Sequence, residues 1–431
     1  MVSLYHSVSL KETAMDCLTP DDIYAAAKQL SSKIINTPTL PAPALSKLLG
    51  CQLYLKHEQL QHTSSFKARG AYLAILALTD AERAQGVITM SAGNHAQAVA
   101  YHAQKLNIHA TIVMPKQTPF AKVERTRAFG AEIVLEGRNL NECEKTVAQL
   151  QRQHGYSLIH PYDDAHVIRG QGTVGLEILD SVPDLDCLVV PIGGGGLIGG
   201  ISLIAKSIKP DIEVIGVEAE LYASMYQTLN GQSLAVGGET IAEGIAVKIP
   251  GALTVPLAKA YVDNILLVTE QQLEWAVGTL AERERVIAEG AGAAGIAALY
   301  GYQQKFSGKK VGVVICGGNI DMRLLGTILN RNMMSDGRLV RLRIDISDEP
   351  GMLASISSAI GDSGGNIVEI YHQRMFYDVP AKLAKIDAIV DTRGQAHVEE
   401  IIAALVAKHF SVSIIDENSS RERAYTPLGE A

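Results

Sequence analysis

The chain of 431 residues is poor in cysteine: its five cysteines form no C-x-x-C pair and no spacing that is typical of a metal site. Lysine and arginine (38) are outnumbered by aspartate and glutamate (46), which excludes the basic surface of a nucleic-acid-binding protein. No run reaches the ~18 apolar residues of a membrane span, and the first twenty residues lack the apolar core of a secretory signal. We therefore expect a cytoplasmic protein with no nucleic-acid partner and no membrane partner.

Apolar residues are plentiful, at 47% of the chain, and the length suits two or three domains. Up to residue 330, short and nearly all-apolar segments alternate with helical segments, which is typical of buried parallel strands with crossover helices. The pattern predicts an α/β fold with two doubly wound sheets in a region 1–335, with a smaller subdomain of about 55–155 inserted in the larger one. Its strands are predicted at 87–90, 110–114, 133–135, 188–192, 214–217, 265–268 and 311–316, and its helices include 20–32, 96–106, 140–151 and 273–287.

The pattern changes near residues 335–338, where a linker is expected. Strands are predicted at 339–346, 366–374, 384–390 and 412–415, with helices at 352–360 and 396–410. This order is a βαββαβ unit, which is typical of small regulatory domains. We expect such an α+β domain at 336–418 and a flexible tail at 419–431.

A glycine-rich stretch, V-V-P-I-G-G-G-G-L-I-G-G at 189–200, follows a predicted strand and begins a predicted helix. It contains G-x-G-x-x-G at Gly194, Gly196 and Gly199, and Glu218 lies where the ribose-binding acid of a dinucleotide fold is expected. Backbone N–H groups at a helix N-terminus can equally hold the single phosphate of a smaller cofactor. Both interpretations stay open on this motif alone.

Two other segments carry groups that suit chemistry on an amino acid. Lys67 lies between Phe66 and an apolar run at 71–78; a lysine that is partly removed from water has a lowered pKa and can form an imine with an aldehyde. The segment S-A-G-N-H at 91–95 lies between a predicted strand and a predicted helix, where it can bind a carboxylate. A solvent-facing lysine and an ordinary helix cap are the alternative interpretations.

Five motifs occur in one order along the chain: E-x-x-x-x-T-x-S-F-K-x-R-G-A (58–71), S-A-G-N-H-A-Q (91–97), G-Q-G-T (170–173), P-x-G-G-G-G-L (191–197) and C-G-G-N (316–319). Together they resemble the threonine dehydratase (threonine ammonia-lyase) family, pyridoxal-phosphate enzymes of the tryptophan-synthase-β fold type. The resemblance covers about residues 15–330. The remainder resembles an ACT domain, with D-E-P-G-M-L at 348–353.

This resemblance implies pyridoxal 5'-phosphate as cofactor and conversion of L-threonine to 2-oxobutanoate and ammonia, with L-serine to pyruvate as a side activity. Lys67 would hold the cofactor through an imine and would take the α-proton of the substrate. The other cofactor-binding residues would be Phe66, Asn94, Gly193, Gly194, Gly195, Gly196, Leu197, Gly244 and Cys316. The substrate would be bound by Ser64, Ser91, Ala92, Gly93, Asn94, His95 and Glu289.

Three positions depart from patterns in the family. In racemases of this fold a serine supplies a second base where this chain has Ala92, so racemisation is disfavoured. Cys316 stands where many relatives have serine, and a neutral thiol cannot keep the pyridine nitrogen protonated as a carboxylate does. Some relatives bind a metal starting at the acid that matches Glu218, but Ser224 stands where a second carboxylate is expected, so we expect no metal.

The ACT resemblance implies an amino-acid effector, isoleucine or valine, bound by Asp348, Gly351 and Asn366. A homodimer or homotetramer is expected. Two alternatives remain for the whole chain. One is an NAD-dependent oxidoreductase that uses the G-x-G-x-x-G at 194–199, and the other is a non-catalytic amino-acid sensor.

Overall fold

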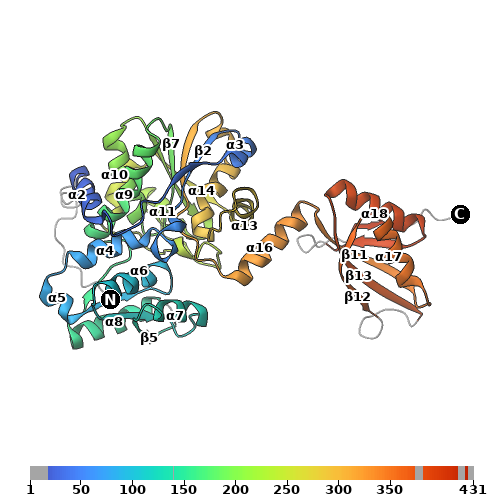
Figure 1. Ribbon diagram of the computed structural model, residues 1–431, viewed down its shortest axis with the longest axis horizontal. Coiled ribbons are helices and arrows are strands. Elements are labelled where there is room, and N and C mark those ends of the chain that lie inside the picture. Colours follow the sequence, from blue (N-terminus) through green and yellow to red (C-terminus); the bar gives the residue numbers. More distant parts are fainter. Residues whose placement is uncertain (1–17, 139, 374–381, 416–422, 426–431) are drawn as a thin grey trace. The chain divides into compact units, whose positions relative to one another are not determined.

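The computed structural model describes residues 18–138, 140–373, 382–415 and 423–425, which leaves Cys17 outside the described residues. The chain divides into two compact units, Met1–Asp321 and Met322–Ala431. Two sheets belong to the first unit and a third sheet to the second (Figure 1). Helix α16 (Met322–Ser335) begins the second unit, whereas the sequence-based division at 335 places it at the end of the first.

The larger sheet of the first unit has the strand order β1-β2-β10-β7-β8-β9, and all its neighbours run parallel except β1 and β2. Helix α14 packs on one face of this sheet and α9 on the other (Figure 1). Val189 of β7 lies near Gly295 of α14, whereas the next residue toward the N-terminus, Leu188, lies on the face where Ile178 of α9 packs. The strands are β1 (Thr39–Pro41), β2 (Gln52–Lys56), β7 (Cys187–Pro191), β8 (Glu213–Ala219), β9 (Asn264–Val268) and β10 (Lys310–Val314).

The smaller sheet is entirely parallel, with the order β5-β4-β3-β6. Its central strands are apolar and buried, and they have the predicted bounds, 87–90 and 110–114. The strands are β3 (Val87–Met90), β4 (Ala110–Met114), β5 (Glu132–Leu135) and β6 (Ser157–Leu158). The predicted α/β fold with two doubly wound sheets is confirmed.

Several helices of the first unit begin with the capping residues that the sequence provides. Thr19, Thr79 and Thr269 each form a capping box with the residue three positions later. The helices are α2 (Pro20–Leu30), α3 (Pro43–Leu49), η1 (Glu58–Leu60), η2 (His62–Ser64), α4 (Lys67–Leu76), α5 (Asp80–Gln85), α6 (Asn94–Lys105), α7 (Phe120–Arg127), α8 (Leu140–His154), α9 (Ala165–Ser181), α10 (Gly196–Ile208), η3 (Glu220–Tyr222), α11 (Ser224–Leu229), η4 (Glu243–Ile245), α12 (Thr254–Tyr261), α13 (Glu270–Thr279), η5 (Leu280–Glu284), α14 (Gly290–Gly301) and α15 (Gln303–Phe306).

The helix predicted at 273–287 is shorter in the structure. Helix α13 ends at Thr279, and η5 continues it as one wide π-helical turn. Arg285 then adopts a left-handed conformation (φ 58°), which a right-handed helix cannot include. The residues after it lead into the loop that carries Glu289, the N-cap of α14.

Helices α9 and α10 cross at very short distance because both carry glycine at the contact. A Cβ on Gly200 would lie 2.3 Å from the carbonyl oxygen of Ile168, and a Cβ on Gly172 would lie 2.9 Å from that of Gly200. Gly199 faces Leu257 of α12 in the same way, at 3.2 Å. The last two glycines of the 189–200 stretch therefore serve helix packing.

The second unit contains an antiparallel sheet with the order β12-β13-β11-β14-β15. Its elements are α16, β11 (Leu339–Ser347), α17 (Met352–Asp362), β12 (Asn366–Gln373), β13 (Leu383–Asp391), α18 (Gln395–Ala407), β14 (Ser411–Ile414) and β15 (Arg423–Tyr425). The predicted βαββαβ order is present. Residues 423–425, within the expected tail at 419–431, form β15 because their backbone pairs with the edge of β14; the rest of that segment lies outside the described residues.

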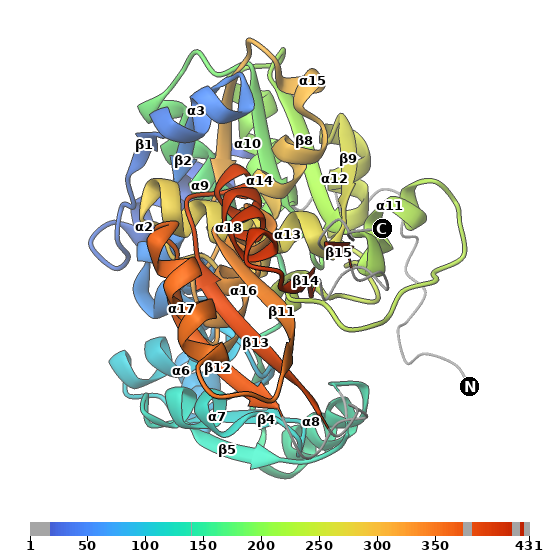
Figure 2. The same ribbon diagram turned by 90° about the vertical axis from the view of Figure 1, so that its right-hand side faces the viewer.

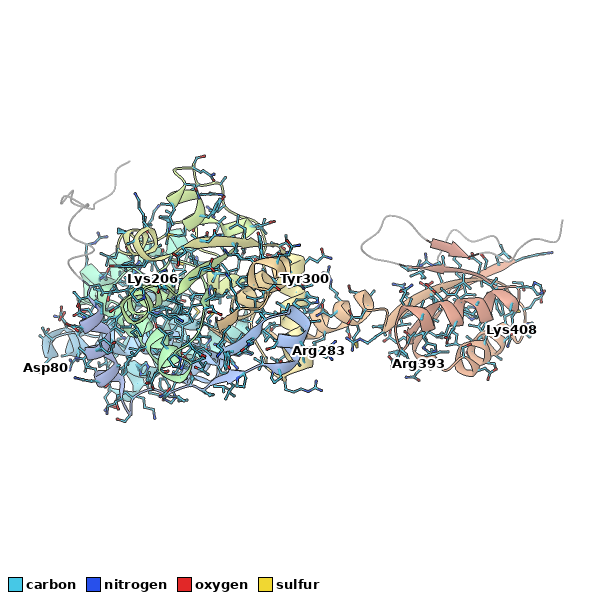
Figure 3. The ribbon with its side chains drawn as sticks, turned by 90° about the horizontal axis from the view of Figure 1, so that it is seen from above. Asp80, Lys206, Arg283, Tyr300, Arg393 and Lys408 are labelled. Carbon is cyan, nitrogen blue, oxygen red and sulfur yellow. The ribbon has the colours of Figure 1, made fainter. Side chains whose placement is uncertain are left out.

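One face of this third sheet is apolar and is covered by α17 and α18 (Figure 2). Strand β11 alternates, with Val340, Leu342, Ile344 and Ile346 buried in that core. Figure 3 marks the two ends of α18 by the side chains of Arg393 and Lys408. Among the described helices of the chain, none is long and apolar enough to cross a membrane.

Candidate active site

The first unit encloses a cavity of about 390 Å3 that is lined from both of its sheets. The lining comes from the carboxyl ends of β3 and β7, from the segment after β10, and from the first residues of α4, α6 and α10. This is where ligands bind in parallel α/β sheets. The structure brings every predicted cofactor- and substrate-binding residue of this unit to the cavity wall except Ser64, whose carbonyl oxygen accepts a hydrogen bond from Gly318 N.

Lys67 is the first residue of α4, and its amine lies inside the cavity. Its Nζ donates a hydrogen bond to the carbonyl oxygen of Pro161 at 2.7 Å and lies 5.2 Å from the centre of the Phe66 ring. Burial lowers the pKa of Lys67 from 10.5 to about 8, although Cys316 and Glu289 oppose this change. About a tenth of the amine is therefore neutral, and nucleophilic, at pH 7, and about half at pH 8.

The glycine loop that enters α10 presents unpaired backbone donors. Among the described residues, none accepts a hydrogen bond from the N–H groups of residues 193–197. Four such orphan donors are expected at the start of any helix, and the helix dipole makes this end favourable for an anion. Gly195, the N-cap, adopts a left-handed conformation (φ 94°) that turns the chain from β7 into the helix. The loop can therefore hold a phosphate group.

The loop glycines are also confined by side chains behind them. A Cβ on Gly194 would lie 2.2 to 2.4 Å from the ring of Tyr162, and one on Gly195 would lie 2.6 Å from Thr254 Oγ1. The Tyr162 hydroxyl donates to the carbonyl oxygen of Ile249 at 3.0 Å, which fixes the ring. Glycine is thus required at 194 and 195 by close packing, while the N–H groups of the loop remain available.

Asn94, the first residue of α6, is held between two other side chains of the cavity. Its Nδ2 donates to Glu289 Oε1 at 2.6 Å, and its Oδ1 accepts from Asn319 Nδ2 at 2.7 Å. Burial raises the pKa of Glu289 from 4.5 to about 7, against the effect of the Asn94 hydrogen bond. Gly244 lies beside this carboxyl group, since a Cβ there would come within 3.5 Å of Glu289 Oε1.

Cys316 is buried, and its thiol faces the same cavity. Burial raises the pKa of the Cys316 thiol well above its usual range, and Glu289 adds to this effect. The group is therefore a neutral thiol at physiological pH. Its backbone carbonyl accepts a hydrogen bond from Phe66 N at 3.1 Å, which joins the segment after β10 to the lysine segment.

The start of α6 forms a second set of free donors. The Ser91 hydroxyl accepts from Gly93 N at 3.2 Å, and the N–H groups of Asn94 and His95 have no acceptor among the described residues. His95 Nε2 lies 2.9 Å from the carbonyl oxygen of Ile159, and burial lowers the pKa of His95 to about 3. His95 is therefore neutral. The arrangement suits a carboxylate bound to N–H and hydroxyl donors.

Helix α4, which begins with Lys67, is anchored by a network of buried and partly buried charged side chains. The guanidinium of Arg69 donates to Glu58 at 2.7 and 2.9 Å and to Glu177 of α9 at 2.7 Å, and neither Arg69 nor Glu58 is exposed. Lys56 of β2 pairs with Glu177 at 2.5 Å. Although burial pushes the pKa of Glu58 upward, the charge and hydrogen bonds of Arg69 hold it below its usual value.

Several cavity residues carry no assigned role from the sequence. Tyr162 and Pro161 belong to an irregular segment with no recognisable spacing, and Lys122 and Glu243, which form an ion pair at the cavity wall, are 121 residues apart. Asn319 lies inside the quoted C-G-G-N motif, which is the one signal that could have found it.

The dinucleotide interpretation of the glycine stretch fails at Glu218. This buried carboxylate accepts hydrogen bonds from Met225 N at 2.8 Å and Tyr226 N at 2.9 Å, so it caps α11 instead of facing a ribose. Burial raises the pKa of Glu218 to about 7, against the effect of these two bonds. The G-x-G-x-x-G pattern therefore lacks its acidic partner.

The fold and the cavity define an α/β enzyme site in which a reactive lysine faces an anion-binding helix start. The chain matches the family described as "Pyridoxal-phosphate dependent enzyme" over residues 30–317. It is 43% identical over 400 residues to the L-threonine ammonia-lyase of Thermotoga maritima, which covers 92% of this chain and 100% of that protein. The chain therefore belongs to the family of pyridoxal-phosphate dependent enzymes.

Solved structures of this fold resemble more than two thirds of the chain. Threonine deaminase isoform 2 from Solanum lycopersicum is 36% identical, with a TM-score of 0.68, covering 74% of this chain and 88% of that one. Serine racemase from Dictyostelium discoideum is 37% identical, with a TM-score of 0.66, covering 71% of this chain and 100% of that one. The cofactor is pyridoxal phosphate, and the cavity fits it: unpaired N–H groups for a phosphate lie across from a lysine of lowered pKa.

Proposed function

We propose that this chain is an L-threonine ammonia-lyase, which converts L-threonine to 2-oxobutanoate and ammonia and L-serine to pyruvate as a side activity. The relative with 43% identity that bears this name aligns over its whole length. The observation that carries the proposal is the Lys67 amine, half neutral near pH 8, in a cavity that offers no side-chain base at position 92.

The proposed cofactor site uses groups from both sheets. The N–H groups of residues 193–197 would bind the phosphate, and Lys67 would hold the cofactor covalently. Asn94 and Phe66 would position its ring, with the neutral thiol of Cys316 near the ring nitrogen. When bound, pyridoxal phosphate withdraws electrons from the carbon that loses its proton. Because the Cys316 thiol is neutral, this withdrawal would be weaker than with a carboxylate partner, which suits rapid loss of a β-substituent.

Lys67 would be the residue that moves the proton. Its Nζ is desolvated and accepts a proton readily near pH 8, and the Pro161 carbonyl fixes the direction of one N–H bond. When its amine is free, Lys67 would take the α-proton of the substrate on one face.

The substrate carboxylate would bind at the start of α6, to the Ser91 hydroxyl and the free N–H groups of Asn94 and His95. Ala92 lines the same wall and carries no proton-transfer group. Racemisation requires a second acid or base on the opposite face of the α-carbon, so the site favours elimination.

Purified protein, loaded with pyridoxal phosphate, should release 2-oxobutanoate and ammonia in equal amounts from L-threonine. The same sample should form little D-serine from L-serine. Faster formation of D-serine than of pyruvate would assign the site to racemisation instead, and no 2-oxobutanoate would rule out the proposal.

We further propose that the second unit is an ACT-like regulatory domain. Gly351, with φ 92°, turns the chain from β11 into α17, and apart from its neighbours in the chain no described residue has an atom within 4 Å of its Cβ position. Asp348 follows the end of β11, close to Gly351 in the chain, whereas Asn366 begins β12 at the opposite end of the sheet, because Ser347 pairs with Leu383 and Asn366 pairs with Asp391. The structure therefore does not bring Asn366 together with the other two expected effector residues within one subunit. Asp348 and Gly351 would bind isoleucine or valine through the helix start. Isoleucine should shift the threonine saturation curve several-fold, as coupling of about 1–3 kcal/mol produces, and Asp348→Ala should reduce the shift.

A further inference from the structure

The C-G-G-N segment after β10 holds the residues that precede Lys67. Thr63 and Ser64 both adopt left-handed conformations (φ 58° and 55°), which are unfavourable for side chains other than glycine. Their carbonyl oxygens are both bound by this segment: Gly318 N donates to Ser64 O at 3.0 Å, and Asn319 Nδ2 donates to Thr63 O at 2.8 Å. The strained turn is therefore restrained by hydrogen bonds from the other end of the unit.

The same amide nitrogen of Asn319 reaches across the cavity. Its second N–H donates to Asn94 Oδ1 at 2.7 Å, so that both hydrogens of the group are used. Asn94 in turn donates one N–H to Glu289. A single side chain thus links the turn before Lys67 to the first residue of α6.

These contacts determine which way the Asn94 amide faces. In the reverse orientation, its NH2 group would meet the NH2 group of Asn319, and its oxygen would meet the carboxyl group of Glu289. The contact between the two NH2 groups would be repulsive, and so would the contact between the oxygen and the ionised carboxyl group of Glu289. With the observed orientation, the second N–H of Asn94 remains for a ligand in the cavity.

We infer that Asn319 is a positioning residue: it fixes the Asn94 amide so that its second N–H is available to the cofactor, and it restrains the strained turn that presents Lys67. This inference rests on the cofactor site proposed above. It predicts that loss of the Asn319 amide weakens cofactor binding even when the protein remains folded.

The test uses Asn319→Asp, which removes both N–H donors with little change in shape. Asn230→Asp is the matched control, because this exposed asparagine carries the same change in charge outside the cavity. Apoprotein is titrated with pyridoxal phosphate, and binding is followed by visible absorbance, at a temperature at which each apoprotein is folded. We expect about tenfold or weaker binding and a displaced absorbance band for Asn319→Asp, since two hydrogen bonds are lost. Asn230→Asp should match the parent.

Thermal unfolding of each apoprotein separates positioning from a merely structural role. A lower unfolding temperature with unchanged affinity and an unchanged band would overturn the inference. If Asn319→Asp does not fold, the same titration is done with Asn319→Ala, which also lacks the N–H donors. An affinity within about twofold of the parent would contradict the inference. Failure of the parent to turn over L-threonine would count against the proposed function only, because the titration measures cofactor binding.

Discussion

Replacing Glu289 by glutamine should stabilise the apoprotein at about pH 8 and leave its stability unchanged at about pH 4. Glu289 is held in the folded cavity with its pKa raised by burial from 4.5 to about 7. At pH 8 the folded protein must therefore keep an ionised carboxylate in a place that disfavours it. The rise in pKa corresponds to an upper limit of about 3 kcal/mol, at about 1.4 kcal/mol per pH unit.

The direction follows from proton binding. Between pH 4.5 and about 7 the folded protein keeps the Glu289 proton while the unfolded chain has lost it, so stability falls as the pH rises through this window. Below the window both states are protonated and the cost vanishes. Glutamine avoids the cost at every pH, and its Oε1 can still accept the hydrogen bond from Asn94.

The assay is urea unfolding of the parent and of Glu289→Gln, each without cofactor, at the two pH values. The exposed Glu239 provides the control, since Glu239→Gln should change stability little at either pH. A gain for Glu289→Gln of equal size at both pH values, or no gain at pH 8, would refute the reasoning.

Two further substitutions, each with a second-site partner, test the residues that hold α4 and the glycine loop in place. Arg69→Met leaves the buried carboxylate of Glu58 and the partly buried carboxylate of Glu177 with Lys56 as their only cation within this network, and should cost about 3–5 kcal/mol in urea unfolding. Arg69→Met combined with Glu58→Gln should recover part of this, and a loss below about 1 kcal/mol would contradict the account. Gly194→Ala places a methyl group within 2.2 to 2.4 Å of the Tyr162 ring. It should weaken pyridoxal-phosphate binding about tenfold or more, with partial recovery on adding Tyr162→Ala; unchanged affinity in the titration would show that the loop can shift freely.

The parts of the fold that could be predicted from the sequence are those in which neighbouring residues alone determine the secondary structure. Strands β3 and β4 are nearly all apolar, with one threonine each, and their bounds agree with the prediction. Strands β1 and β6 were missed because they are three and two residues long and partly exposed, so neither has an apolar period to detect. The helical segment that α13 begins ends with the turn η5, before the left-handed Arg285, and no residue type nearby predicts this conformation.

The site was predictable where one motif supplies several groups. Lys67 and the glycine loop each belong to such a motif, and the structure brings both to the cavity. The packing of Tyr162 against Gly194 was not predictable, because the two residues come together only through the fold. The bond between Asn319 and Asn94 spans 225 residues, and that between Asn94 and Glu289 spans 195. Sequence spacing carries no information on such contacts.

The glycines of the 189–200 stretch are required for more than one structural reason. Gly195 provides the left-handed turn, and Gly194 leaves room for the Tyr162 ring. Gly200 allows α9 and α10 to cross. The phosphate-binding property arises from the N–H groups of the same loop. A phosphate site and a packing site therefore coincide in one segment.

The central claim is that Lys67 carries the cofactor in a site that deaminates L-threonine. The most direct measurement is reduction of the pyridoxal-phosphate-loaded protein with borohydride, which fixes the cofactor to its lysine, followed by mass mapping of the peptides. The account predicts that the adduct lies on Lys67, and that Lys67→Ala has neither the adduct nor release of 2-oxobutanoate from L-threonine. An adduct on another lysine, or undiminished threonine turnover by Lys67→Ala, would contradict it.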